Sequence, residues 1–99
     1  MTRWLITGAG GQLGADLLRV LAERPGVEAI GFARADLDIA DETAVRAAFA
    51  QVRPDVVINA AAYTAVDAAE TDEAGATLGN EVGPRNLAVA AAAAGARMI

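Results

Sequence analysis

The chain contains no cysteine and no histidine. It therefore cannot form a disulfide, a thiolate or imidazole metal site, or a Ser-His-Asp triad from its own residues. The basic residues are few and scattered, and the formal net charge of -5 gives no support for nucleic-acid binding. The longest apolar run, Leu87 to Ala94, is too short and too rich in alanine to span a bilayer, and no charged leader opens the chain. These features predict a cytoplasmic protein that binds no nucleic acid, membrane or metal.

The length of 99 residues suits one domain with a modest core, but it is short for an enzyme that binds both a dinucleotide and a substrate. The final residues, Met98 and Ile99, fall within an expected strand. We therefore expect residues 1–99 to be the N-terminal part of an NAD(P)-binding domain, with the remaining domain and the substrate-binding region outside this sequence.

Apolar segments alternate with amphipathic ones along the chain, which predicts a βαβαβαβ order. Strands are expected at residues 3–7, 28–32, 55–59 and 96–99. A first helix is expected at 11–23, and a second from an N-cap at Asp41 until Pro54 stops it. After a loop around residues 60–64, a long helical region is expected to run to about residue 94, with breaks at Gly79 and Gly83-Pro84. With right-handed crossovers, this order predicts an α/β Rossmann-type parallel sheet with flanking helices, strand order 3-2-1-4, truncated after the start of the fourth strand.

A glycine-rich turn joins the first strand to the first helix, with Gly8, Gly11 and Gly14 in a G-x-x-G-x-x-G pattern. Gly8 would permit the tight turn, Gly11 would let the backbone approach a pyrophosphate, and Gly14 would let the helix pack on the strand. Helix-start amides would then face the phosphates. No Lys follows the turn, which excludes a Walker A loop. An ordinary strand-to-helix turn is the alternative.

Two stretches after the second strand are typical of the adenosine end of a dinucleotide site. Ala33 stands where an acidic residue would accept the ribose hydroxyls of NAD, and Arg34 could pair with a 2′-phosphate, so NADPH is favoured over NADH. A solvated Arg34 is equally compatible. Asp38 could accept a hydrogen bond from the adenine amino group while Ile39 covers the ring, although Asp36 and Asp38 could instead be turn or capping residues.

The third strand is followed by small residues and two hydroxyl side chains. The backbone of Ala60, Ala61 and Ala62 could lie against the cofactor, and Tyr63 and Thr64 could bond its ribose or phosphate. Packing alone would also explain small residues at a strand end. Asp67 and Glu70 could suggest acid/base or metal chemistry, but acids near a helix start more often compensate its dipole.

Several stretches together resemble the dTDP-4-dehydrorhamnose reductase family of extended short-chain dehydrogenase/reductases. They are Ile6 to Gly14, Leu37-Asp38-Ile39, Arg53 to Asp67, Ala69-Glu70, and Asn80 with Gly83 to Ala88. The resemblance covers nearly the whole chain, and the stretch from Arg53 to Glu70 is its most specific part.

The resemblance implies reduction of dTDP-4-dehydro-L-rhamnose to dTDP-L-rhamnose by the full-length protein, with NADPH or NADH as cofactor. A homodimer is a separate expectation. It places Gly11, Gln12 and Leu13 at the pyrophosphate side, Asp38 and Ile39 at the adenine, and the sequence Ala62-Tyr63-Thr64 at the nicotinamide side. Ala33 departs from the Asp commonly found there, which weakens the NADH interpretation.

The resemblance also implies that the catalytic Ser/Thr and Tyr-x-x-x-Lys lie after the fourth strand, so this chain supplies no catalytic residue and is expected to be inactive alone. Tyr63 has no Lys four residues on. Two alternatives remain open: a non-catalytic NADP-binding regulatory subunit of the same superfamily, and a nucleotide-sugar epimerase or dehydratase.

Overall fold

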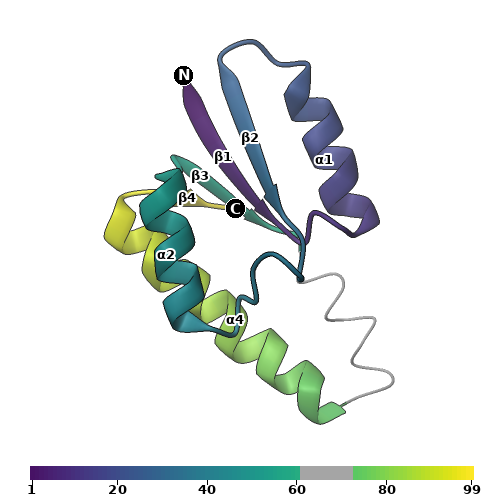
Figure 1. Ribbon diagram of the computed structural model, residues 1–99, viewed down its shortest axis with the longest axis vertical. Coiled ribbons are helices and arrows are strands. Elements are labelled where there is room, and N and C mark those ends of the chain that lie inside the picture. Colours follow the sequence, from purple (N-terminus) through teal and green to yellow (C-terminus); the bar gives the residue numbers. More distant parts are fainter. Residues whose placement is uncertain (61–72) are drawn as a thin grey trace.

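The computed structural model describes residues 1–60 and 73–99, which form a parallel sheet with helices on both faces (Figure 1). The strands are β1 (Thr2–Thr7), β2 (Val27–Phe32), β3 (Val56–Asn59) and β4 (Arg97–Met98), and the helices are α1 (Gln12–Ala22), α2 (Glu42–Val52) and α4 (Glu73–Ala94). Helix α1 lies on one side of the sheet, and α2 and α4 lie on the other. The expected α/β Rossmann-type sheet is confirmed.

The strand order is β2-β1-β3-β4, so the expected order 3-2-1-4 is wrong. Because α1 covers one face, a right-handed crossover through α2 on the opposite face must carry the chain back past β1. Strand β3 therefore pairs with β1 and not with β2. The paired residues run from Trp4 opposite Val56 to Thr7 opposite Asn59. Strand β4 pairs with β3, so the fourth strand does not lie beside β1 as expected.

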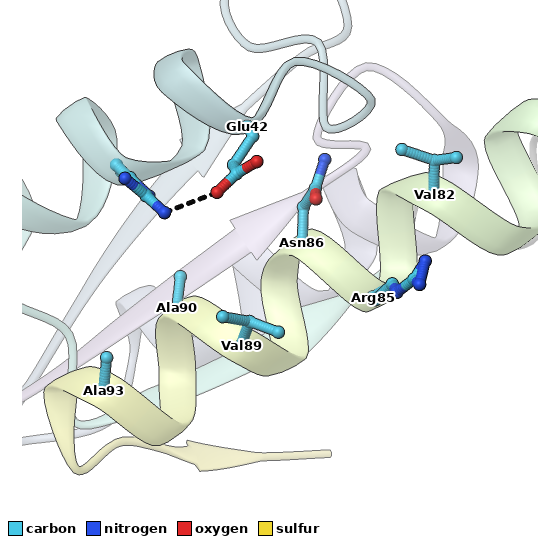
Figure 2. Close-up of a pocket in the computed structure, with 8 residues that line it drawn as sticks. Glu42, Val82, Arg85, Asn86, Val89, Ala90 and Ala93 are labelled. Carbon is cyan, nitrogen blue, oxygen red and sulfur yellow. Dashed lines mark hydrogen bonds and ion pairs between the residues drawn. The ribbon is translucent and has the colours of Figure 1, made fainter.

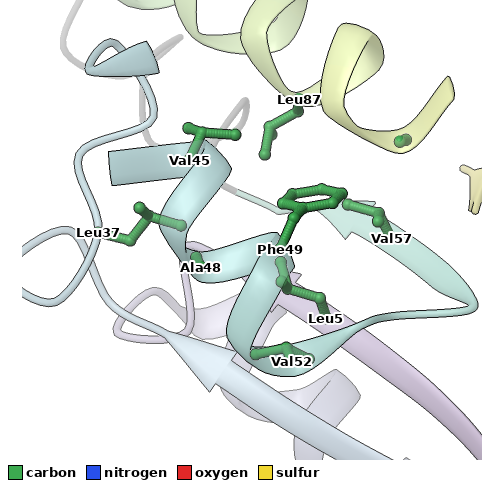
Figure 3. Packing of buried hydrophobic residues seen from close by; sticks show 9 residues of the cluster. Leu5, Leu37, Val45, Ala48, Phe49, Val52, Val57 and Leu87 are labelled. Carbon is green, nitrogen blue, oxygen red and sulfur yellow. The ribbon is translucent and has the colours of Figure 1, made fainter. Parts of the chain in front are cut away.

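The larger core cluster lies between the sheet and the helices α2 and α4 (Figure 3). Helix α2 contributes residues spaced three or four apart, which share one face of a helix. The Phe49 ring lies among Leu5, Val57 and Leu87, so one aromatic side chain contacts β1, β3 and α4. The buried members of this cluster are Leu5, Leu37, Val45, Ala48, Phe49, Val52, Val57, Leu87 and Ala91.

A smaller cluster lies on the opposite face, beneath α1. Ile6 of β1 and Leu21 of α1 are buried in it, with Leu17 and Leu18 packed around them. Because successive residues of a strand point to opposite faces, Leu5 and Ile6 belong to different clusters. Strand β1 is therefore the element shared by both halves of the core.

The ends of the helices follow the expected capping chemistry. The Asp41 carboxylate accepts a hydrogen bond from the Ala44 amide at 3.1 Å, which confirms the predicted N-cap of α2. Arg53 ends α2 in the left-handed region, with φ of 53°, and its amide donates to the Phe49 carbonyl. Gly95 follows α4 with φ of 71°, as expected of a C′ glycine.

Helix α4 runs without interruption from Glu73 to Ala94, so the predicted breaks at Gly79 and Gly83-Pro84 are wrong. Pro84 lacks an amide hydrogen and removes one helical hydrogen bond, but it does not end the helix. The glycine before it serves packing, because a Cβ at Gly83 would lie 2.6 Å from Ile39 Cδ1. Tertiary contact with the loop after β2 thus outweighs the local tendency to break.

The position of Phe49 predicts a large loss of stability on truncation. We expect Phe49→Ala to lower the free energy of unfolding by about 3 to 5 kcal/mol, because it removes a buried ring that contacts three elements. Val20→Ala on α1 is the control, since Val20 is 50% exposed, and should change stability little. Urea denaturation would measure both, and equal midpoints would contradict the assignment of Phe49 to the core.

Candidate dinucleotide-binding site

The strand order reverses between β1 and β3, and this reversal fixes the place of the candidate site. In open α/β sheets, ligands bind beyond the carboxyl ends of the strands at such a switch point. Thr7, which is 1% exposed at the end of β1, donates its hydroxyl to Asn59 Oδ1 of β3 at 2.8 Å. This hydrogen bond joins the two strand ends directly below the candidate site.

The glycine turn leaves β1 at this edge of the sheet. Gly8 has φ of 68°, a conformation that favours glycine, so its predicted role in the tight turn is confirmed. The Gly11 amide donates to the Gly8 carbonyl at 3.0 Å, and the Ala9 amide donates to the Phe32 carbonyl at 3.1 Å. The second bond attaches the turn to the end of β2, so the turn sits across two strands.

Gly14 permits the close contact between α1 and the turn that was predicted from its spacing. A Cβ at Gly14 would lie 2.2 Å from the Gly8 carbonyl oxygen and 2.8 Å from Ala9 Cα. Both neighbours are backbone atoms, so neither can rotate away. The position of the first turn of α1 relative to β1 therefore depends on glycine at this place.

The first turn of α1 offers backbone amides to an anion. Its N-cap is Gly11, which has extended backbone (φ of -84°, ψ of 169°) and makes no side-chain capping hydrogen bond. The first turn of the helix contains no acidic residue. Gln12 and Leu13 are exposed. The first amides of a helix have no partner within the helix, and the helix dipole favours a negative group beside them. This arrangement suits a phosphate group.

The loop after β2 lies against the glycine turn. A Cβ at Gly10 would be in ordinary contact with Ala33 Cβ, at 3.5 Å. The Asp36 carboxylate accepts a hydrogen bond from the Ala33 amide at 3.1 Å, so Asp36 is a turn residue, one of the roles considered for it. Arg34 is exposed and forms no ion pair with the part of the chain that the structure describes. Its guanidinium is thus available to a ligand at this edge.

The next residues of this loop carry the two side chains expected at the adenine. Asp38 is exposed, and its Oδ1 accepts a hydrogen bond from the Ala40 amide at 3.0 Å. Ile39 is half-buried and packs against the larger core cluster, which also buries Leu37. Asp38 therefore has a turn-forming role within the loop, one of the roles considered for it, and its other carboxylate oxygen remains at the surface.

The residues expected after β3 are only partly covered by the described structure. Ala60 is 2% exposed and packs in the smaller cluster with Ile6 and Leu21, so its side chain has a packing role. Ala61, Ala62, Tyr63 and Thr64 lie outside the described residues, as do Asp67 and Glu70. Their contribution to the site stays a prediction from the sequence.

Neither a metal cluster nor a membrane span occurs in the described ranges 1–60 and 73–99. No group of three or more acidic side chains there could hold a metal ion. Within the same ranges, no helix combines the length and apolar character needed to cross a membrane.

Sequence reasoning missed two polar interactions around this edge. The first is the hydrogen bond between Thr7 and Asn59. These are the last residues of β1 and β3, two strands that were not expected to be neighbours. The second joins Asn86 of α4 to the loop after β2, where its Nδ2 donates to the Ile39 carbonyl at 2.9 Å. A polar residue at the last position of each apolar strand was the available signal for the first pair. No local pattern indicates the second.

A family model for the RmlD substrate binding domain matches residues 2–99. The chain belongs to this family. Proteins with similar sequences include a dTDP-4-dehydrorhamnose reductase from Streptomyces griseus, which is 50% identical over 97 residues. A second is a protein from Streptomyces antibioticus named probable dTDP-4,6-dihydroxy-2-methyloxan-3-one 4-ketoreductase, which is 58% identical over 87 residues.

The chain spans about a third of these relatives' length. It covers 32% of the S. griseus reductase and 29% of the S. antibioticus protein, while the matches cover 98% and 87% of the chain. A crystal structure of dTDP-4-dehydrorhamnose reductase from Bacillus anthracis in complex with NADP has a TM-score of 0.85 and 37% identity to it. That match covers 99% of this chain and 35% of the reductase.

The contact at Gly14 generates a prediction with a matched control. We expect Gly14→Ala to lower the free energy of unfolding by at least about 2 kcal/mol, because the added methyl group collides with backbone that cannot move without shifting α1. Gly10→Ala makes only an ordinary contact with Ala33 and should change stability by less than about 1 kcal/mol. Chemical denaturation of the two variants would measure the difference, and equal losses would show that the tight contact is not limiting.

Proposed function

We propose that the protein containing this chain reduces the 4-keto group of a dTDP-sugar with NADPH, and that residues 1–99 bind the phosphate and adenosine parts of the cofactor. The chain's own geometry supports the binding role through the glycine turn, held against α1 at Gly14 and against β2 at Ala9. The printed names of the S. griseus and B. anthracis relatives support the reductase activity. The observation that carries the proposal is the uncapped, acid-free start of α1 at the strand reversal.

The residues at this edge fit a dinucleotide. In this proposal the backbone amides of Gln12 and Leu13 bind the pyrophosphate and Gly11 leaves space for it, supported by the uncapped start of α1. Gly8 and Gly14 hold the turn in place but make their contacts with protein backbone. Next to the turn, Ala33 brings no charge that would repel a 2′-phosphate, and Arg34 is exposed beside it.

The chemistry divides between this chain and the rest of the protein. When bound, NADPH supplies the hydride that turns a ketone into an alcohol. Residues 1–99 bind and orient the cofactor, and we assign to them no proton transfer to the carbonyl oxygen. In this proposal the general acid is a side chain outside residues 1–99, consistent with the resemblance to extended short-chain reductases.

The sugar is proposed at the level of a dTDP-4-keto-6-deoxyhexose, with dTDP-4-dehydro-L-rhamnose as the first candidate. The name of the S. griseus relative supports that candidate. The more identical S. antibioticus protein, a 4-ketoreductase by name, favours a second candidate, a different dTDP-linked 4-keto sugar. The cytoplasmic location and the homodimer stay predictions from the sequence.

The direct test follows the oxidation of NADPH by the full-length protein with dTDP-4-dehydro-L-rhamnose and with a second dTDP-4-keto sugar. We expect turnover of at least one of them and formation of the corresponding dTDP-deoxysugar. Binding of NADPH without turnover of either sugar would instead indicate the regulatory-subunit alternative. Interconversion of UDP-hexoses without net oxidation of the cofactor would indicate an epimerase.

Arg34 generates a prediction about cofactor preference. We expect Arg34→Ala to weaken NADPH binding by about 1.5 kcal/mol, the lower end for a charge-assisted hydrogen bond because the side chain is exposed, and to leave NADH binding unchanged. Arg24→Ala is the control, because it removes the same charge from an exposed position that follows the C-terminal end of α1, remote from the glycine turn. Calorimetric titration would measure the affinities, and equal NADPH and NADH affinities in all three proteins would contradict the role of Arg34.

Gly11 generates a prediction about the phosphate position. Its extended backbone is open to any residue, so Gly11→Val should fold, with only the modest cost of a poorer N-cap. We expect it to abolish NADPH binding, because the side chain would fill the space proposed for the pyrophosphate. Ala15→Val adds the same side chain at an exposed position of α1 and should retain binding. A folded Gly11→Val variant with unchanged affinity would show that this turn is not the phosphate site.

A further inference from the structure

We infer that Gly83 and Asn86 of α4 are positioning residues for the adenosine end of the cofactor, because they hold the loop that carries Asp38 and Ile39 in place. This inference rests on the proposed function and adds residues that the glycine motif does not include. The contacts of α4 with residues 33–41, the loop between β2 and α2, support it.

The first contact is a hydrogen bond between elements far apart in sequence. Asn86 Nδ2 donates to the Ile39 carbonyl oxygen at 2.9 Å, across 47 residues, in a partly buried position. Figure 2 shows the Asn86 side chain pointing away from the axis of α4, toward the side where Glu42 begins α2. The bond therefore fixes the loop backbone one residue after Asp38. A side chain without an amide donor, such as alanine, would lose this hydrogen bond.

The second contact is steric and lies one turn earlier on the same helix. A Cβ at Gly83 would lie 2.6 Å from both Cδ1 and Cγ1 of Ile39. Glycine at this position lets the Ile39 side chain rest against the backbone of α4. The side chain and the carbonyl of Ile39 are thus held by Gly83 and Asn86, two positions one turn apart on one helix.

The remaining contacts explain why this hold determines the place of Asp38. Leu37 is 6% exposed and anchored in the larger core cluster, where Leu87 of α4 is also buried. Asp38 lies between the buried Leu37 and the clamped Ile39, so its backbone has little freedom. The Asp38 carboxylate accepts a hydrogen bond from the Ala40 amide, and this bond restricts the orientation of the carboxylate. Helix α4 therefore sets the position of the acceptor proposed for the adenine.

The neighbouring hollow between α2 and α4 is not needed for this role. It has a volume of about 550 Å³ and is lined in part by Val82, Arg85 and Val89 of α4. On its α2 side, Glu42 and Arg46 form an ion pair (Figure 2). Asn86 also lines this hollow, but its Nδ2 donates to the Ile39 carbonyl. Arg85, exposed on the same turn of α4 as Asn86, supplies a control for the experiment.

The test compares Asn86→Ala, Gly83→Ala and the control Arg85→Ala in the full-length protein. Hydrogen exchange without cofactor reports on the loop, since the Asp36 and Leu37 amides donate to the Ala33 carbonyl and the Asp41 amide donates to the Asp38 carbonyl. Titration with NADPH and with 2′,5′-ADP, which lacks the nicotinamide, reports on the adenosine end. The KM for NADPH and kcat at saturating NADPH separate binding from the hydride step.

We expect Asn86→Ala to accelerate exchange in residues 36–41 and to weaken both ligands by about two- to tenfold, the range for one lost hydrogen bond. Gly83→Ala should weaken both ligands as well, by displacing Ile39. The KM for NADPH should rise in parallel while kcat stays within about twofold, because the reacting end is untouched. Arg85→Ala should match the wild type in every measurement.

Four results would overturn the inference. Unchanged affinity for 2′,5′-ADP in both variants, with wild-type binding intact, would refute it and leave the proposed function standing. Faster loop exchange without loss of affinity would show a purely structural contact, and a fall in kcat with unchanged KM would place the effect at the reacting end. If the wild type binds neither NADPH nor 2′,5′-ADP, the proposed function is wrong and the inference is wrong with it.

Discussion

A parallel sheet must be covered on both faces, and in this chain that constraint determines where the candidate site lies. Helix α1 takes one face between β1 and β2, so α2 must take the other, and the chain passes back across β1 before β3 begins. The carboxyl ends of β1 and β3 are thereby brought together at the reversal, where Thr7 and Asn59 are hydrogen-bonded. The glycine turn and the loop after β2 both leave the sheet at this edge, and the Ala9 amide of the turn donates to the Phe32 carbonyl at the end of β2.

Backbone contacts, more than side chains, define this edge. Gly14 abuts the Gly8 carbonyl, and Gly31 within β2 makes room for Leu18 of α1, whose Cδ1 a Cβ there would meet at 2.5 Å. Glycine thus allows α1 to lie close to both β1 and β2 while leaving its first amides exposed. The same means recurs on the opposite face, where Gly83 admits Ile39 against α4. Glycine at these positions therefore allows the helices to pack closely and also leaves the ligand edge of the sheet open.

The sequence predicted those features that depend on neighbours along the chain. The βαβ alternation, the N-cap at Asp41, the left-handed Gly8 and the close contact of Gly14 all follow from local patterns and are confirmed. The strand order could not be derived in this way, because right-handed crossovers permit β3 on either side of the first two strands, depending on which face α2 covers. The continuity of α4 through Pro84 and the bond from Asn86 to Ile39 depend on tertiary contacts between residues far apart in sequence, which no local spacing reveals.

The only tryptophan among these 99 residues, Trp4, lies half-buried on the α1 side of β1, and its indole Nε1 is buried without a hydrogen-bond partner in the described structure. An indole in such apolar surroundings emits fluorescence at shorter wavelength than one in water. Trp4 occupies the amino-terminal half of β1, away from the glycine turn that follows Thr7. Its emission is therefore a built-in optical signal for the separation of α1 from the sheet, recorded at a distance from the edge where a nucleotide would bind.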